Sequence, residues 1–181
     1  TVAVGAAGRY YARVRANTGT AGLFAQYLLR IEEVIPADLT APQIVADTLP
    51  AEGSTTSGIW DRFDLSFSEE LSPVTVNNTA AYELRQAGMD NVFGTGDDAL
   101  YAVATSPAYA NGTNAAYWTT DGPLQPGRYR LTVQTSVVDL NLNPLPAPYV
   151  RTFTVTNVPG FVFENRTNHS AAGATSLSLS P

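Results

Sequence analysis

The run Phe63-Asp64-Leu65-Ser66-Phe67-Ser68 decides the fold class of this chain. Its apolar residues occupy every second position, and successive side chains of an extended strand point to opposite faces. One face of such a strand is expected to enter a hydrophobic core, while the other faces water. The same alternation recurs at residues 10–15, 128–133 and 150–155. The sequence therefore predicts a protein rich in half-buried β-strands.

Turn-forming residues separate these alternating runs. Glycine, proline and asparagine recur between them, at residues 17–19, 52–54, 94–96, 111–112 and 126–127. Such residues favour tight turns, and short strands at this spacing are typical of a sandwich or a barrel. Residues 23–33 suit a strand as well, and only residues 79–82 are expected to form a helical turn. We therefore expect an all-β fold.

The composition excludes several classes of function. Hydrophobic residues make up 44% of the 181 residues, which is enough for a buried core, whereas only 14% are charged. All ten basic residues are arginine, and the sixteen acidic residues give a formal net charge of −6. Nucleic acids and anionic membrane surfaces are bound through clustered positive charge. We therefore expect neither of them as a partner.

The chain contains no cysteine, which rules out disulfide bonds and thiolate metal sites. The absence of cysteine fits an exported bacterial protein that relies on its core for stability. No apolar run approaches the roughly 20 residues of a transmembrane helix, and no signal peptide is visible at Thr1. We expect a secreted or cell-surface protein without membrane insertion, whose export signal would lie upstream of this chain.

Prolines and changes of composition divide the chain into four zones. Residues 1–35 are expected to form a strand–turn–strand unit, and residues 36–42 contain two prolines that interrupt any β-ladder, which predicts a linker. Residues 43–158 contain seven or eight predicted strands, the right number for one sandwich. The last zone, residues 159–181, begins with a Pro-Gly break and a short predicted strand at residues 161–163, followed by a polar tail.

Short motifs follow one another through the middle of the chain: Thr40-Ala41-Pro42, Phe67-Ser68-Glu69-Glu70-Leu71, Leu124-Gln125-Pro126-Gly127-Arg128-Tyr129 and Asp139-Leu140-Asn141-Leu142-Asn143-Pro144-Leu145. Over about two-thirds of the chain, their order and spacing resemble the bacterial Ig-like domain family of S-layer and other large surface proteins. The resemblance implies an immunoglobulin-like β-sandwich. It departs from the family at Leu142, where glycine is usual, and this leaves the geometry of that turn open.

Two further segments stand at the front of the chain, Gly8-Arg9-Tyr10-Tyr11-Ala12-Arg13-Val14 and Gln26-Tyr27-Leu28-Leu29-Arg30-Ile31. They resemble the last two strands of another small β-sandwich, the pre-peptidase C-terminal (PPC) module. The tail from Glu164 to Leu179 is similar to the first strand of that module, whose central part is absent here. The resemblance implies a partial second β-sandwich built from the terminal zones.

An incomplete front unit predicts assembly between chains. A lone two-stranded hairpin is marginally stable in water, and its open edge leaves backbone groups unpaired. Donation of the tail strand to the hairpin of the next copy would build a head-to-tail filament. Two alternatives remain: the tail folds back on its own hairpin, or the chain is one repeat of a longer protein. The residues expected at the contact are Tyr10, Tyr11, Val14, Tyr27, Leu29, Ile31, Leu177 and Leu179.

The loop from Asp90 to Asp98 is the candidate metal site. Its possible ligands are Asp90, Asn91, Asp97 and Asp98, which surround two glycines. Calcium takes six to eight hard oxygen ligands, and loops of this kind supply them. The spacing is not that of an EF-hand. The alternative is a hairpin loop whose polar side chains bond their own backbone.

No catalytic constellation is recognisable, and we expect a protein that is not an enzyme. The single histidine, His169, lies in the polar tail without a group to orient it. Glu69 and Glu70 are adjacent on an expected strand and would point to opposite faces. The alternating oxygen side chains of residues 139–143 are expected to stabilise a turn rather than hold a metal.

Three aromatic residues, Trp60, Tyr117 and Trp118, are candidates for a platform that stacks on a sugar, although a sandwich also needs large residues in its core. Two functions follow. The first is a structural or adhesive module of an extracellular surface protein or filament, with other copies or adjacent domains as partners. The alternative is a carbohydrate- or protein-binding accessory module. Exposed, coplanar tryptophans would favour the second function, and buried ones the first.

Overall fold

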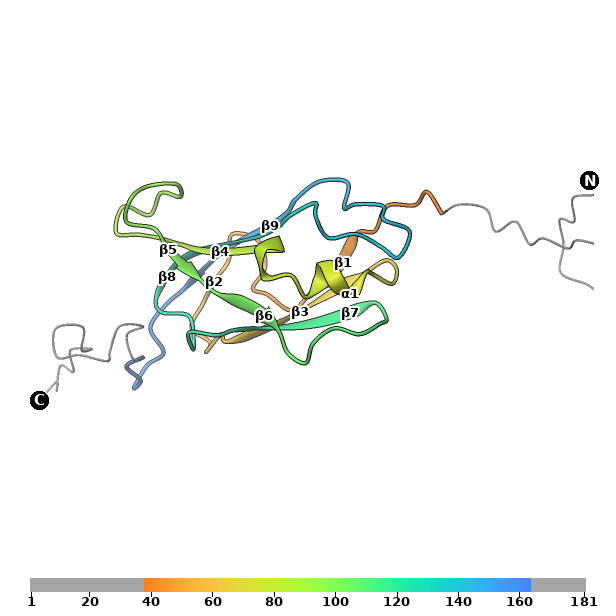
Figure 1. Ribbon diagram of the computed structural model, residues 1–181. Helices are drawn as coiled ribbons and strands as arrows, with labels where there is room; N and C mark the ends of the chain where they lie inside the picture. Colours follow the sequence, from red (N-terminus) through yellow and green to blue (C-terminus); the bar gives the residue numbers. More distant parts are fainter. Residues whose placement is uncertain (1–37, 164–181) are drawn as a thin grey trace, which may run out of the picture. The chain divides into compact units, whose positions relative to one another are not determined.

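The computed structural model describes residues 38–163 (Figure 1). Nine strands and two short helical turns follow one another along this part of the chain. They are β1 (Ile44–Asp47), β2 (Thr55–Thr56), β3 (Arg62–Phe67), α1 (Pro73–Val76), η1 (Thr79–Ala81), β4 (Tyr82–Ala87), β5 (Ala99–Tyr101), β6 (Val103–Thr105), β7 (Asn114–Thr119), β8 (Gly127–Val133) and β9 (Tyr149–Val155).

The strands form two sheets, which confirms the all-β sandwich predicted from the sequence. The four-stranded sheet has the order β1-β3-β7-β6, and the five-stranded sheet has the order β2-β9-β8-β4-β5. Neighbouring strands are antiparallel except for β2 and β9, which run parallel. The chain passes from one sheet to the other between β5 and β6, which are edge strands of three residues each. Short edge strands offer little backbone for unwanted pairing.

The core lies between the sheets and is filled by the inward-facing residues of the alternating runs. On β3, the side chains of Phe63, Leu65 and Phe67 are at most 4% exposed. Arg62 and Asp64 lie on the opposite face of the strand and are exposed to water. The runs at residues 128–133 and 150–155 also bury alternate residues, as expected. These residues are Tyr129, Leu131, Val133, Phe153 and Val155.

A buried polar contact joins the two sheets at one side of the sandwich. Asp47 on β1 accepts a hydrogen bond of 2.6 Å from the Tyr149 hydroxyl and pairs with the guanidinium of Arg151, and both partners belong to β9. The side chains of Asp47 and Arg151 are only 7% and 22% exposed. Inward-pointing charges of this kind also hinder the addition of a further strand at an edge.

The sandwich has two poles, and the chain enters and leaves at opposite ones (Figure 1). At the N-terminal pole, β1 begins beside the end of β3, and Asn143 Nδ2 donates to the Asp38 carbonyl (3.0 Å). At the C-terminal pole, β9 ends beside the start of β8, and the loop of residues 88–98 leaves the end of β4. The N-terminal pole comprises residues 38–43, 68–76 and 138–144, and the C-terminal pole comprises residues 57–61, 88–98, 120–126 and 156–163.

Local predictions differ from the structure in two places. Residues 161–163 are not a strand, because the backbone turns at Gly160 (φ +82°) and Phe161 N donates to Val158 O (3.0 Å). The helix α1 was not predicted, whereas the helical turn expected at residues 79–82 is the 3₁₀ turn η1. Across residues 38–163, no helix is long and apolar enough to span a membrane.

Candidate functional site

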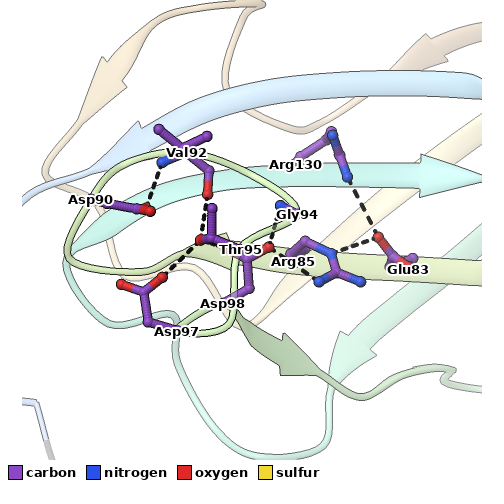
Figure 2. Close-up of polar contacts among 9 residues, drawn as sticks. All are labelled: Glu83, Arg85, Asp90, Val92, Gly94, Thr95, Asp97, Asp98 and Arg130. Carbon is purple, nitrogen blue, oxygen red and sulfur yellow. Dashed lines mark hydrogen bonds and ion pairs between the residues drawn. The ribbon is translucent and has the colours of Figure 1, made fainter.

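Asp98 anchors the loop of residues 88–98, the candidate metal site (Figure 2). Its Oδ2 accepts hydrogen bonds from the Gly94 amide (2.6 Å) and from Arg85 on β4 (3.1 Å), and only 1% of its side chain is exposed. The bond from Gly94, followed by that from Arg85, lowers the pKa of Asp98. The carboxylate is therefore charged at neutral pH and holds the loop against the five-stranded sheet.

Thr95 connects Asp98 with Asp97 inside the loop. The Thr95 hydroxyl lies 2.7 Å from Asp97 Oδ1 and 3.5 Å from Asp98 Oδ1. Asp97 Oδ2 also accepts from the Met89 amide (2.7 Å), and the bond from Thr95 is the main reason that the pKa of Asp97 is lowered. The carboxylate of Asp90 has a different partner, because its Oδ1 accepts from the Val92 amide (2.9 Å).

A phenylalanine that contacts two arginines completes the loop, and no sequence pattern predicted this arrangement. The guanidinium carbons of Arg128 and Arg130 lie 4.9 Å and 4.7 Å from the centre of the Phe93 ring, within cation–π range. Arg128 also donates to the Asn91 carbonyl (3.0 Å). Nε of Arg130 is buried without a hydrogen-bond partner, and the negative face of the ring partly offsets its charge. The spacing of the arginines, two apart on β8, predicts a shared face but not what covers it.

The four residues expected to bind calcium make different contacts within the loop. The structure brings together Asp97 and Asp98, two of the four expected ligands, around the Thr95 hydroxyl. Asp90 instead accepts a hydrogen bond from the Val92 amide, and the Asn91 carbonyl accepts one from Arg128. The carboxylates thus have protein partners that stabilise the loop, and calcium binding here stays a prediction.

A second acidic group, not predicted from the sequence, lies at the N-terminal pole. One carboxylate oxygen each of Asp38, Glu69 and Asp139 lies within 4.8 Å of the others, the one such group of three among residues 38–163. Asp139 is 1% exposed and accepts from the Asn141 amide, the Asn143 amide and the Asn143 side chain, each at 2.8 Å. This confirms the turn-stabilising role expected for residues 139–143. No sequence signal connects residues 38, 69 and 139.

The charges of this acidic group affect one another. Burial, then the nearby carboxylates of Asp38 and Asp139, raises the pKa of Glu69. Burial alone would raise the pKa of Asp139 too, but the hydrogen bonds from Asn143 and Asn141 lower it below its ordinary value. Glu69 and Asp139 share a hydrogen bond, which raises the pKa of Glu69 and lowers the pKa of Asp139. Carboxylate oxygens in this arrangement are of the type that a hard cation such as calcium prefers.

The three candidate aromatic residues do not form one platform, and the prediction for Tyr117 is wrong. Tyr117 is 1% exposed, stacks on Phe63 (5.1 Å between ring centres) and shares a hydrogen bond of 2.9 Å with Tyr82. Trp60 is half-buried and packs against the core. Trp118 is 43% exposed, because it follows Tyr117 on β7 and points to the opposite face.

The remaining candidates lie outside the described residues. These are His169 and the predicted assembly residues Tyr10, Tyr11, Val14, Tyr27, Leu29, Ile31, Leu177 and Leu179. The resemblance of both termini to a PPC module also falls there.

Comparison with solved structures finds similar chains at low sequence identity. The chain is similar to PcoC, a methionine-rich copper resistance protein from Escherichia coli, with 21% identity over 65% of this chain and 100% of that one (TM-score 0.47). It is also similar to domains 1–6 of the surface layer protein SbsC, with 13% identity over 65% of this chain but only 14% of that one (TM-score 0.41).

The family comparison is more specific. None of the curated proteins compared matches the chain. The Bacterial Ig-like domain family matches residues 38–155, which is more than half of the chain and spans every strand from β1 to β9. This chain belongs to the bacterial Ig-like domain family.

Proposed function

We propose that this chain is a non-catalytic structural or adhesive module of an extracellular surface protein or filament. The observation that supports it most is the path of the chain, which enters and leaves the sandwich at opposite poles (Figure 1). Modules with this path can follow one another in a line, as a spacer or an array requires. Fold alone does not fix function, so the proposal also depends on how the polar groups are used.

The polar clusters of residues 38–163 serve the fold itself. Asp98 and Asp97 bond their own loop, Asp139 bonds its own turn, and the paired Tyr82 and Tyr117 lie in the core. The cavity beside Trp60, about 10 Å³ in volume, holds at most one water molecule and is itself too small for a ligand. Together with membership of a family of structural modules, this supports a role other than catalysis.

Extracellular location is part of the proposal. The chain has no cysteine and no lysine, and few charged residues cover its surface. Protease treatment of intact cells that make the protein tests the location. Fragments of residues 38–163 should be released without lysis, and their appearance only after lysis would contradict a surface location.

We further propose that copies assemble head-to-tail through β-strand complementation, in which the PPC-like tail of one copy completes the PPC-like front unit of the next. Leu177 and Leu179 alternate with serines, as a half-buried donated strand requires. The variant Leu177→Asn with Leu179→Asn should lose self-association in sedimentation experiments. The matched control is Ser176→Asn with Ser178→Asn, on the other face of the same strand. Equal association of both variants would exclude strand donation.

Carbohydrate binding is the second candidate, and exposed Trp118 favours it. Its cross-strand neighbours are Arg62 and Ala104, which place a charged group and a small residue beside the ring. A sugar could stack on such a ring and bond the guanidinium. Glycan-array binding that Trp118→Ala abolishes, and that the control Trp60→Phe at a half-buried position retains, would support this function. The absence of binding to any glycan would remove it.

A further inference from the structure

The connection between β6 and β7 carries the one Asn-Gly pair of the sequence, Asn111-Gly112. The sequence predicted a turn at this pair, and the backbone bends there, with Gly112 at φ +89°. Asn111 is exposed, and a Cβ atom on Gly112 would meet nothing within 4 Å. The pair therefore lies in open space at the surface, where its own chemistry is not hindered by neighbouring side chains.

Hydrogen bonds fix the backbone on the carbonyl side of the pair. The Tyr109 hydroxyl donates to the Gly112 carbonyl, and Phe67 N donates to Thr113 O (2.7 Å). By contrast, the side-chain amide of Asn111 and the backbone amide of Gly112 have no hydrogen-bond partner in the part of the chain that the structure describes. These two free groups are the ones that react with each other when an asparagine precedes a glycine.

The pair Asp121-Gly122 offers a comparison within the same chain, because aspartate before glycine can undergo the same ring closure. Gly122 also has a positive φ, of +91°, and a Cβ atom there would meet nothing within 4 Å. Here, however, Gly122 N donates to Thr119 O (3.3 Å), and Asp121 Oδ2 accepts from Ala102 N (3.1 Å). Both reacting groups are thus occupied, in contrast to those of the Asn-Gly pair.

We propose that Asn111 is a site of spontaneous deamidation in the folded protein. The backbone nitrogen of Gly112 loses its proton and attacks Asn111 Cγ, the bond from Cγ to the side-chain nitrogen breaks, and that nitrogen takes up a proton and leaves as ammonia. The cyclic imide that remains is opened by one water molecule. Opening at Cγ gives aspartate, whereas opening at the main-chain carbonyl gives isoaspartate. No enzyme, oxidant or cofactor is required, and this modification does not depend on the structural role proposed above.

The two products differ in their effect on the loop. Aspartate adds only a negative charge, whereas isoaspartate also inserts a methylene group into the main chain directly before Gly112. The Gly112 carbonyl binds the hydroxyl of buried Tyr109, which in turn accepts from Leu71 N (3.0 Å). Isoaspartate displaces this carbonyl and so weakens the contact of the loop with the segment that follows β3.

Incubation of the purified full chain at neutral and mildly alkaline pH, followed by peptide mass spectrometry, tests the reaction. Conversion of Asn111 should be at least about tenfold faster than that of Asn114, whose following residue, Ala115, has a Cβ atom and lies within β7. The rate should rise with pH, because the attacking nitrogen must lose its proton. The matched variant is Asn111→Gln, which keeps a side-chain amide but would have to close a larger ring, and it should give no product at this position.

Folded and urea-unfolded samples separate the effect of the structure from that of the sequence. Asn111 should react in both, whereas Asp121 should isomerise only after unfolding has broken its hydrogen bonds. Conversion of Asn111 in urea alone would overturn the proposal, because the folded loop would then prevent the attack. Equal rates at Asn111 and Asn114 would also overturn it. So would a sugar on Asn111 in protein from its natural source, since Asn111-Gly112-Thr113 fits the acceptor pattern for N-glycosylation.

Comparison of the separated isoaspartate form with the variant Asn111→Asp tests the effect on the loop. The variant has the same charge without the extra methylene group in the main chain. The isoaspartate form should melt at a lower temperature than the variant, and hydrogen exchange of the Leu71 amide should be faster, because this amide donates to Tyr109. Equal melting temperatures and equal exchange would overturn the assigned effect of isoaspartate on this contact.

Discussion

Leu142 stands where the family usually has glycine, and it adopts a backbone conformation that favours glycine. The sequence motif places leucine where the family usually has glycine, and this left the geometry of the turn open. The structure keeps the left-handed conformation, with φ +70°, and Asp139 accepts bonds from the backbone of Asn141 and Asn143 around it. The side chain of Asp139 therefore holds the turn even though leucine opposes it.

Leu142→Gly should stabilise the folded protein by about 1 kcal/mol, because glycine adopts a positive φ without the steric cost of a Cβ atom. Urea denaturation at low protein concentration measures the change in the free energy of unfolding. Leu140→Gly is the matched control and should be neutral or destabilising, since Leu140 has no positive φ. Destabilisation by Leu142→Gly would show that the side chain contributes to stability despite its exposure.

The raised pKa of Glu69 predicts that this residue stabilises the folded protein more in acid than at neutral pH. Its pKa is raised above 4.5 in the folded protein, so the folded state binds this proton more tightly than the unfolded chain does. Glu69 therefore contributes stability at pH below about 4.5, and this contribution is lost as the pH rises through the raised pKa. Glu69→Gln removes the titration and should melt at a higher temperature than wild type at neutral pH, with the difference shrinking in acid.

Thermal melts from acid to neutral pH test this expectation, and Glu70→Gln controls for the loss of one exposed negative charge. Asp139 acts in the opposite sense, because its lowered pKa means that its contribution is lost as the pH falls. Parallel curves for wild type and Glu69→Gln would contradict the assigned role of Glu69.

At the scale of elements, the loop of residues 88–98 depends on close packing at one glycine. A Cβ atom on Gly88 would lie 2.2 Å from the Asp97 carboxylate and 2.6 Å from its carbonyl oxygen, whereas one on Gly96 would meet nothing within 4 Å. Gly88→Ala should lower the free energy of unfolding by about 1–3 kcal/mol through this overlap, and speed hydrogen exchange of the Gly94 amide. Gly96→Ala is the matched control, and equal melting temperatures for the two variants would contradict the loop packing.

Calcium binding is a separate prediction for the same loop. A ligand that binds only the folded state raises the melting temperature by mass action, so added calcium should stabilise the protein and a chelator should reverse the effect. If the loop is the site, Asp90→Asn with Asp97→Asn abolishes the response and Asp38→Asn retains it. The opposite result would assign calcium to the acidic group of Asp38, Glu69 and Asp139. A melting curve that is the same across millimolar calcium would exclude both sites.

At the scale of the whole molecule, the contact of Asp47 with Arg151 and Tyr149 ties one sheet to the other. Removing one partner of a buried ion pair leaves the other charge unpaired, so Asp47→Ala should destabilise the protein by about 3 kcal/mol. Asp61→Ala breaks an exposed pair with Arg62 and should cost at most about 1 kcal/mol. Chemical denaturation compares the free energy of unfolding of the two variants. Similar losses would show that the contact between the sheets stabilises the protein no more than an exposed ion pair does.

The sequence predicted those parts of the fold that depend on neighbouring residues. Alternation along residues 63–68 identified the inward face of β3, and the glycines and prolines between the runs marked the turns. The Asp139–Asn143 motif predicted a turn held by its own side chains, because donors and acceptor lie within five residues. Tyr117 was the exception, since alternation alone does not tell which of two adjacent aromatic residues on β7 faces the core.

Only the tertiary structure decided which residues that are far apart in the sequence come into contact. Asp38, Glu69 and Asp139 come together because the start of β1, the end of β3 and the turn before β9 share one pole. Phe93 meets Arg130 because β4 and β8 are neighbours in a sheet. Local patterns fix which face of a strand is apolar, but the order of strands in the sheets fixes which loops become neighbours.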